Sequence, residues 1–390
     1  METIIELYDS DPVMNYISPC ALKPKNVVYL CEKHSFRKNH IRTVRSFYKL
    51  RKQKINAVMY KNKGSVNDYL RSFEEIYRNF PGCCIDVTGG EDTALVAAGM
   101  FTCIQKDARL ISYDQRKNRF SNIYNCIEVD KLRFQEKFRI SELIAMSGAL
   151  VTGHGHFNPG SLTGEALADI DKIWKIYLDN LFTWHKNVQY LQAVSKLHSG
   201  SLHVEASMLS PSSVGRFEKP QRKIMQELGD AGIIKNLSFT AGSIVFGYKN
   251  DNIRRCLTDV GMCLELFVYK TALEADFFDD VSISVIIDWN GRIAEPNDTT
   301  NEIDVMLTKG LTPVFISCKT GIPSTASLNE VHTLATRLGG SFAKPVLATM
   351  NNLKETAPSL CNRAAELGVT LIELDDLVDG RLEGILRKLV

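Results

Sequence analysis

Apolar positions in the first third of the chain alternate between two spacings. Continuous apolar runs of strand length recur, and the segments between them carry one apolar position every three or four residues, which is the helical period. The strand-like runs lie at residues 4–8, 26–31, 56–60, 83–90 and 108–114, and the helix-like segments at 40–54, 67–80 and 91–105. Strands that alternate with helices form a parallel sheet with covering helices. The pattern predicts an α/β domain over residues 1–145 with a six-stranded Rossmann-like sheet.

The pattern changes character between residues 146 and 250. A long helical segment at 166–186 is followed by a connector rich in Pro, Ser and Gly at 210–220. Residues 221–248 then predict a helix, a glycine-containing turn and a short hairpin, an order typical of a small winged-helix-like module. Such modules bind nucleic acid or join domains, and we favour the joining role, so residues 146–250 are expected to form a linker.

Residues 251–390 predict a second compact α/β domain. A helix at 252–273 precedes three consecutive strand patterns, and alternating helices and strands complete the chain. The three strand patterns lie at 281–289, 301–307 and 312–319. A meander of strands followed by helix–strand alternation predicts one sheet covered by helices.

The length and composition agree with a soluble protein of two or three domains. The chain has 390 residues, of which 44% are hydrophobic. No uncharged apolar run reaches the roughly 18 residues that a membrane span needs, and the first residues lack the basic and apolar regions of a signal peptide. We therefore expect a cytoplasmic protein without a membrane partner. Its ten cysteines are scattered, often within apolar runs, and are interpreted as reduced core thiols rather than disulfides.

The positive charge is concentrated in one segment although the net charge is only +2. Residues 33–67 contain eleven Lys or Arg and no Asp or Glu. This imbalance is expected of a surface that meets an anion, but taken alone it is better explained by a solvated face of one basic helix. The HGH sequence at 154–156 has no partner at zinc-like spacing, so a structural zinc site is not expected.

Two neighbouring predicted strands of the last domain carry charges on one face. Because side chains alternate along a strand, Glu302 and Asp304 share one face, as do Ser317 and Lys319 on the next strand. Glu265 adds a carboxylate from the preceding helix. Carboxylates hold hard divalent cations that activate water, and a lysine can orient the nucleophile or stabilise charge. Charged strand ends are common, so this spacing alone matches unrelated proteins, but the combination predicts hydrolysis of a phosphodiester.

Loops at the carboxyl ends of the first sheet suit a small anionic ligand. Ligands of open parallel sheets bind at these strand ends, where backbone N–H groups and helix N-termini are free. No GxGxxG or GxxxxGK[ST] sequence is present, so neither a dinucleotide nor a P-loop nucleotide is indicated. A tight turn without a ligand is the simpler alternative for the two glycines. The candidate ligand-binding residues are Ser10 and Asp11 after the first strand, His34 and Ser35 after the second, and Thr88, Gly89, Gly90, Glu91 and Asp92 after the fourth.

The sequence NEIDV followed by ISCKTG resembles the PD-(D/E)xK nuclease superfamily. The resemblance implies that Asp304 is the first acidic metal ligand, Lys319 the motif lysine and Glu265 the helical acid, with the backbone carbonyl of Cys318 as a further metal contact. The implied cofactor is Mg²⁺ or Mn²⁺. Ser317 departs from the motif, which has an acid at that position. Either Glu302 or Glu265 supplies the missing charge, or the site binds metal poorly.

The order of domains resembles that of the CARF-domain ancillary nucleases of type III CRISPR systems, the Card/Can type. The resemblance rests on the TGG loop of a Rossmann-like domain, a small linker and the NEID and CK sequences, and it extends over the whole chain. It implies a homodimer whose CARF domains bind a cyclic oligoadenylate, usually cyclic tetra-adenylate, and thereby activate metal-dependent cutting of DNA, RNA or both. Glu91 and Asp92 follow TGG where family members often have Thr-Lys.

Two other functions remain open. The first is a ligand-sensing regulator that binds nucleic acid through the winged-helix-like module and has a degenerate nuclease domain, which Ser317 would favour. The second is a stand-alone restriction or resolvase-type enzyme whose first domain reads DNA. A glycine loop at strand ends suits a small anion better than a DNA groove, which is usually read by a helix or a β-ribbon.

Overall fold

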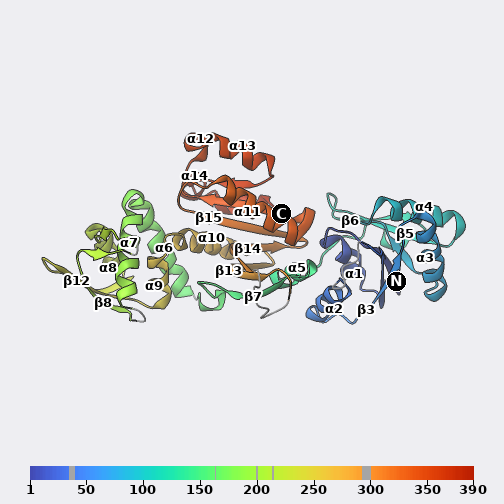
Figure 1. Ribbon diagram of the computed structural model, residues 1–390, viewed down its shortest axis with the longest axis horizontal. Coiled ribbons are helices and arrows are strands. Elements are labelled where there is room, and N and C mark those ends of the chain that lie inside the picture. The colour runs from blue at the N-terminus through green and yellow to red at the C-terminus, as the bar shows by residue number, and fades with distance from the viewer. Residues whose placement is uncertain (35–39, 163, 199–200, 213–214, 292–299) are drawn as a thin grey trace.

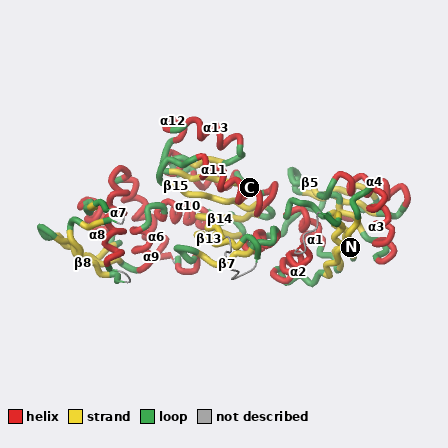
Figure 2. Tube along the Cα trace, viewed as in Figure 1, coloured by secondary structure: helices red, strands yellow, loops and turns green. Residues whose placement is uncertain are grey.

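The computed structural model contains two six-stranded sheets and a smaller module, and it describes residues 1–34, 40–162, 164–198, 201–212, 215–291 and 300–390. Figure 1 shows the three parts in a row: the N-terminal domain at one end, the C-terminal domain in the middle and the module of residues 164–250 at the other end. The trace in Figure 2 shows helices on both sides of the strands in the two sheet domains. In the described part of the chain, no helix is long and apolar enough to cross a membrane.

The N-terminal sheet has the order β3-β2-β1-β4-β5-β6, with β6 antiparallel to β5 and the other pairs parallel. This confirms the predicted alternation of strands and helices. The strand interiors are buried on both faces, as in parallel sheets covered by helices. The elements are β1 (Thr3–Leu7), η1 (Val13–Tyr16), α1 (Ile17–Leu22), β2 (Asn26–Glu32), α2 (His40–Leu50), β3 (Asn56–Asn62), α3 (Val66–Asn79), β4 (Cys84–Asp86), α4 (Asp92–Ile104), β5 (Arg109–Asp114), β6 (Arg119–Tyr124), η2 (Ile127–Val129) and α5 (Ile140–Met146).

The middle of the sequence forms a helical module with a three-stranded antiparallel sheet of order β11-β12-β8. The predicted helix and hairpin of residues 221–248 are present as α8, β11 and β12. The helical sequence predicted at 166–186 forms parts of two helices that meet at Asn180. The elements are η3 (Pro159–Ser161), α6 (Gly164–Asp179), α7 (Leu181–Leu197), β8 (His203–Ser207), β9 (Ser210–Pro211), β10 (Phe217–Glu218), α8 (Arg222–Asp230), β11 (Ile234–Phe239) and β12 (Ser243–Tyr248).

The C-terminal sheet has the order β17-β16-β15-β14-β13-β7. The meander β13-β14-β15 is antiparallel as predicted, and β16 and β17 continue it in parallel. Its edge strand β7 comes from residues that precede the module. The elements are β7 (Leu150–His154), α9 (Asp251–Thr258), α10 (Met262–Glu274), β13 (Asp280–Asp288), β14 (Thr300–Lys309), β15 (Thr312–Lys319), α11 (Thr325–Gly339), η4 (Gly340–Phe342), β16 (Lys344–Thr349), α12 (Leu353–Thr356), α13 (Pro358–Glu366), β17 (Thr370–Ile372), α14 (Leu374–Val378) and α15 (Leu382–Lys388).

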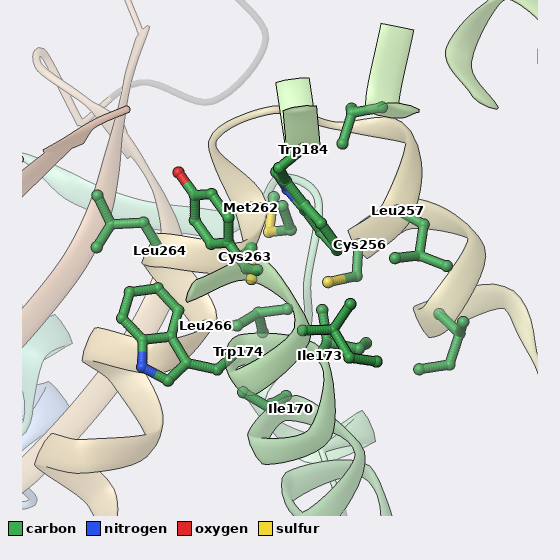
Figure 3. Packing of buried hydrophobic residues seen from close by; sticks show 14 of the residues in the cluster. Ile170, Ile173, Trp174, Trp184, Cys256, Leu257, Met262, Cys263, Leu264 and Leu266 are labelled. Carbon is green, nitrogen blue, oxygen red and sulfur yellow. The ribbon is translucent and has the colours of Figure 1, made fainter. Parts of the chain in front are cut away.

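Helix α10 lies between the module and the C-terminal sheet. In Figure 3, Met262, Leu264 and Leu266 of this helix lie among Ile170, Ile173 and Trp174 of α6 and Trp184 of α7. Trp174 stacks on Phe267 with ring centroids 4.0 Å apart. The same apolar cluster continues into β14 and β15 of the C-terminal sheet. One core therefore fixes the position of α10 relative to both neighbours.

The N-terminal domain contacts the C-terminal domain directly. Leu311 and Phe342 of the C-terminal domain are buried in the core of the N-terminal domain. Asp11 accepts a hydrogen bond of 2.8 Å from the backbone N–H of Ser341, and Thr308 donates one of 2.7 Å to the carbonyl of Phe138. We expected residues 146–250 to join the two domains. These residues do connect the two domains along the chain. In space, however, the two domains contact each other directly, and the module of residues 164–250 lies at the far end of the molecule (Figure 1).

The cysteines agree with the expectation of core thiols. All ten are free, and eight are buried, while Cys361 is partly exposed and Cys103 is exposed. Burial raises the pKa of Cys31 to about 11 and that of Cys83 to about 12, so both thiols stay protonated.

Candidate functional sites

The predicted acidic residues and lysine of the C-terminal domain come together where β14 and β15 stop pairing. In β14, Ile303 packs in the core cluster that includes α11, whereas Val305 packs in the cluster that includes α10, so the predicted alternation is interrupted at Asp304 between them. The last residue pair between β14 and β15 is Val305 with Ile316, so Asp304 has no paired residue on β15. The backbone of β15 beyond that pair is therefore open to bonding by a side chain.

Asp304 fills this opening. Its Oδ2 accepts a 2.6 Å hydrogen bond from the backbone N–H of Cys318 and a 3.3 Å bond from the hydroxyl of Ser317. The Nζ atom of Lys319 lies 3.9 Å from the same oxygen. Burial raises the pKa of Asp304, while the Cys318 N–H and the Lys319 ammonium act in the opposite direction. Ser317, which stands where the motif has an acid, therefore serves as a neutral donor to Asp304.

Glu265, in the first turn of α10, lies close to Asp304 and Lys319. Burial is the main cause that raises the pKa of Glu265 to about 8, and the charges of Asp304, Asp259 and Glu302 raise it further. Lys319 partly offsets this effect. Four carboxylates thus lie near one another with one ammonium group, and this surplus of negative charge is unfavourable unless protons or a cation compensate it.

Asp259 is a member of this cluster that the sequence analysis missed. It lies between α9 and α10, where one continuous helix was expected at 252–273, and its Oδ1 accepts a 2.9 Å hydrogen bond from Gly261 N–H. A Cβ atom built on Gly261 would lie 2.9 Å from Oε1 of Glu265 and 3.6 Å from Oδ1 of Asp259. The absence of a side chain at Gly261 therefore leaves room for both carboxylates. The sequence Asp259-Val260-Gly261 was the signal that could have predicted this break in the helix.

The carboxylates suit a hard divalent cation in their chemistry, since oxygen ligands of this kind bind Mg²⁺ and Mn²⁺. Within the described ranges, however, no group of three or more His, Cys, Asp or Glu side chains has an arrangement that could hold a metal ion. The carboxylate oxygens are therefore of the right chemical type for Mg²⁺ or Mn²⁺, but the side chains do not surround a common point at which the ion could bind.

The glycine loop of the N-terminal domain contacts the loop after β1. Asp9 accepts hydrogen bonds from the backbone N–H groups of Gly90 and Asp11, at 2.8 and 2.7 Å. Gly90 has φ +105°, a conformation that favours glycine, and a Cβ atom there would lie 2.6 Å from Cβ of Leu7. Both loops lie at strand ends, as predicted. However, the backbone N–H of Gly90, which was expected to bind an anionic ligand, donates to the carboxylate of Asp9 instead.

A cavity of about 780 Å³ opens beside these loops and extends to the C-terminal domain. The sequence analysis named three of its lining residues, Ser10, Gly90 and Glu91. It missed Asp9, although the residue lies within the loop that was chosen. The other described lining residues are Tyr8, Pro12, Asn15, Tyr16, His40, Thr43, Val44, Met146, Ser147, Gly148, Trp289, Asn290, Arg337 and Leu338.

The remaining candidate ligand residues have other surroundings. Thr88 donates to Asp86 and accepts a 2.8 Å bond from Tyr113 N–H, so its side chain holds the loop. Asp11 bonds to Ser341, as described above, and Asp92 is the exposed first residue of α4. His34 lies in an exposed turn after β2 and does not line the cavity, and Ser35 lies outside the described residues.

The basic segment divides between structural and exposed positions. Arg51 forms ion pairs with Glu136 and Glu142 at 2.8 and 2.9 Å, so it serves the fold. Arg42 and Arg45 lie on the exposed face of α2, opposite the buried Val44 and Phe47 side. For this helix the simpler interpretation, a solvated basic face, fits the structure.

Beneath the glycine loop, Glu6 and Asp86 are adjacent on β1 and β4 and almost fully buried. Burial and the neighbouring Asp86 raise the pKa of Glu6 well above its ordinary value. Burial also raises the pKa of Asp86, but Ser18 and Thr88 donate hydrogen bonds that favour its charged form. Glu6 is therefore the member of the pair that keeps its proton.

Comparison with known proteins gives fold-level similarity over the full length. No family model matches the sequence, and no curated protein matches it. Protein VC1899 from Vibrio cholerae has a similar structure, with a TM-score of 0.78 and 18% identity over 99% of this chain and 97% of that one. The structure of Can2 from Sulfobacillus thermosulfidooxidans in complex with cyclic tetra-adenylate gives a TM-score of 0.72 and 16% identity, with all of both chains covered. The chain therefore has the three-part fold of these two proteins.

Proposed function

We propose that this protein is a metal-dependent nuclease that cuts DNA, RNA or both in type III CRISPR defence, and that a cyclic oligoadenylate activates it. The observation that carries the proposal is the convergence of Asp304, Glu265 and Lys319 where β14 and β15 stop pairing. The full-length similarity to a solved structure that contains cyclic tetra-adenylate supports the choice of activator. In this proposal residues 1–145 form a CARF domain and residues 251–390 a PD-(D/E)xK domain, with residues 146–250 between them in sequence.

The proposed catalytic roles follow from the contacts of each side chain. Asp304, Glu265 and the carbonyl of Cys318 would hold Mg²⁺ or Mn²⁺, which when bound supplies a nucleophilic water and offsets phosphate charge. Lys319, held beside Asp304, orients the water or stabilises the developing charge. Ser317 keeps the carboxylate of Asp304 in place through its hydroxyl. Glu302 supplies the negative charge that the motif places at position 317.

A homodimer is the proposed assembly, and an exposed apolar row supports it. Val96, Met100 and Ile104 occur at four-residue spacing along α4 and are 55%, 47% and 55% exposed. Residues four apart lie on one face of a helix. A contiguous apolar face on the N-terminal domain is suited to a second copy of the chain, and two copies would match the internal symmetry of a cyclic tetranucleotide.

Cleavage of labelled single-stranded DNA, single-stranded RNA and supercoiled plasmid tests the proposal. Each substrate is incubated with Mn²⁺ or Mg²⁺, with and without cyclic tetra-adenylate or cyclic hexa-adenylate. We expect cutting that requires both a metal ion and one of the cyclic ligands. Cutting without any cyclic ligand would instead support a stand-alone enzyme.

A second candidate function is a ligand-sensing regulator that binds nucleic acid without cutting it. Two observations favour it: Ser317 replaces the motif acid, and the described carboxylates do not form a ready metal site. Tight binding of a cyclic oligoadenylate without cleavage of any substrate, at millimolar Mn²⁺, would favour the regulator over the nuclease.

A further inference from the structure

The C-terminal domain supplies one wall of the cavity beside the glycine loop. Trp289 and Asn290 follow β13, and Arg337 and Leu338 lie in the last turn of α11. The opposite wall comes from the N-terminal domain, through the loops after β1 and β4 and through α2. A molecule that fills the cavity therefore touches both domains at once.

The charges of the two walls differ in sign. Asp9 places a carboxylate on the N-terminal side, where it repels a phosphate. Arg337 is the single Lys or Arg among the described lining residues, and His40 is the other group there that can become a cation. Among the described lining residues, the permanent cation that can pair with an anionic ligand is therefore Arg337 of the C-terminal domain.

Trp289 and Arg337 form a preorganised stacking pair. The guanidinium carbon of Arg337 lies 4.1 Å from the centroid of the Trp289 ring, and the indole N–H donates a 2.5 Å hydrogen bond to Asn301. This bond fixes the orientation of the ring. A guanidinium group can stack on a flat ring and still pair with a phosphate through its edge, and bases stack well on aromatic side chains.

The N-terminal wall carries a second aromatic pair. Tyr8 stacks on His40 with ring centroids 4.7 Å apart, and both residues line the cavity. Two stacking pairs, one from each domain, suit a ligand that presents more than one base. A cyclic oligoadenylate has both the bases and the phosphates that these walls would recognise.

We propose that Trp289 and Arg337 belong to the effector site, where Trp289 stacks with an adenine and Arg337 pairs with a phosphate, so that the ligand bridges the two domains within one chain. This inference rests on the proposed function and adds to it the residues through which the C-terminal domain senses the ligand.

The position of Arg337 gives such a ligand a short connection to the cleavage site. Helix α11 packs against β15, the strand that carries Ser317 and Lys319. The short helix η4, which directly follows α11, is joined to the N-terminal domain through the hydrogen bond from Ser341 to Asp11. A ligand that binds Arg337 therefore contacts α11, the helix that packs against β15. Its effect on β15 does not require the module of residues 164–250.

Tryptophan fluorescence and calorimetry of the full-length protein test the inference. The chain has three tryptophans, and Trp174 and Trp184 are buried in the module, at 6% and 1% exposure. Titration with cyclic tetra-adenylate should change the fluorescence of the unmodified protein, and this change should disappear in Trp289→Phe. Calorimetry should show that Trp289→Phe still binds, because phenylalanine also stacks on a base.

Arginine variants provide the second measurement. Arg337→Ala should weaken the affinity for cyclic tetra-adenylate by about tenfold or more, since a charge-assisted bond is lost, and Arg337→Lys should fall between it and the unmodified protein. Arg363→Ala changes another exposed arginine of the same domain and should bind as the unmodified protein does.

The outcomes separate this inference from the proposed function. If the unmodified protein binds neither cyclic tetra-adenylate nor cyclic hexa-adenylate, both fail. If it binds cyclic tetra-adenylate but Arg337→Ala binds equally tightly and the fluorescence of Trp289 does not respond, the proposed function stands and the bridging role of the C-terminal wall is overturned.

Discussion

The candidate cleavage site and the effector cavity are built in opposite ways. The cleavage site collects side chains from two adjacent strands and one helix, all within the C-terminal domain. The cavity collects loops and helix ends from two domains that are separate along the chain. The first arrangement follows from strand register, whereas the second exists only after the domains have docked.

The two sites also differ in how their charges are satisfied. At the cleavage site, carboxylates outnumber the ammonium group, and the pKa of Glu265 is raised to about 8 as a result of burial and repulsion. At the glycine loop, the backbone donor of Gly90 is already used by Asp9. The carboxylates of the proposed cleavage site therefore favour a cation, while an anion at the loop would have to displace the carboxylate of Asp9. Ligand binding and metal binding should consequently respond to different substitutions.

The largest expected effect separates the sites directly. Asp304→Asn removes the charge at the centre of the cleavage site, and we expect cleavage to fall by about 100-fold or more, or about 3 kcal/mol of transition-state stabilisation. Initial cleavage rates at saturating Mn²⁺ and cyclic tetra-adenylate measure this. The affinity for cyclic tetra-adenylate should be unchanged, and Asp379→Asn, an exposed change in the same domain, should cleave normally. Loss of both activities in Asp304→Asn would mean that the two sites are not separate.

The converse change targets the glycine loop. Gly90→Ala forces a side chain into a left-handed conformation against Leu7, and we expect it to lower the free energy of unfolding by about 1–3 kcal/mol and to weaken ligand binding. Chemical denaturation and calorimetry measure the two quantities. Gly99→Ala in α4 is the control, because no heavy atom lies within 4 Å of its added Cβ and alanine favours a helix. Equal ligand affinity in Gly90→Ala and the unmodified protein would contradict the loop assignment.

Asp259 tests whether the cleavage site extends beyond the residues of the motif. Asp259→Asn keeps an acceptor for Gly261 N–H but removes a charge near Glu265, so we expect Mn²⁺ affinity to fall by about tenfold with little change in stability. Calorimetric titration with Mn²⁺ measures it. Asp251→Asn, an exposed change at the start of α9, should leave the affinity unchanged. If the two variants bind Mn²⁺ with the same affinity, Asp259 does not contribute to metal binding and only stabilises the turn between α9 and α10.

The smallest expected effect concerns the buried pair beneath the loop. Because the pKa of Glu6 is raised in the folded protein, its stabilising proton is fully bound below the pKa of the unfolded chain, about 4.3, and stability is lost as the pH rises towards the folded value. Glu6→Gln cannot ionise, so its melting temperature should decline less between pH 5 and pH 8 than that of the unmodified protein. Melting temperatures of the two proteins that change in parallel across this range would show that the pKa of Glu6 is not raised in the folded protein. Glu2→Gln, an exposed change, is the control.

The sequence by itself determined the local parts of this protein. Strand and helix periods predicted the two six-stranded sheets and their covering helices, because side-chain direction depends only on the neighbouring backbone. The shared face of Glu302 and Asp304 stays a prediction, since the alternation along β14 is interrupted at Asp304. The helix expected at 252–273 was an exception, since its periodicity continues through the break at Asp259 and Gly261. This break is what brings Asp259 to the cleavage site.

Tertiary structure alone decided the long-range parts. Nothing near residues 150–154 indicates that they form the edge of a sheet whose other strands begin 130 residues later at Asp280. Nor does any local pattern connect Arg337 and Trp289 with Asp9 and Gly90. Their meeting depends on the burial of Leu311 and Phe342 in the N-terminal core. Docking of this kind is set by the complementary shape of two folded surfaces, which the period of a single segment does not encode.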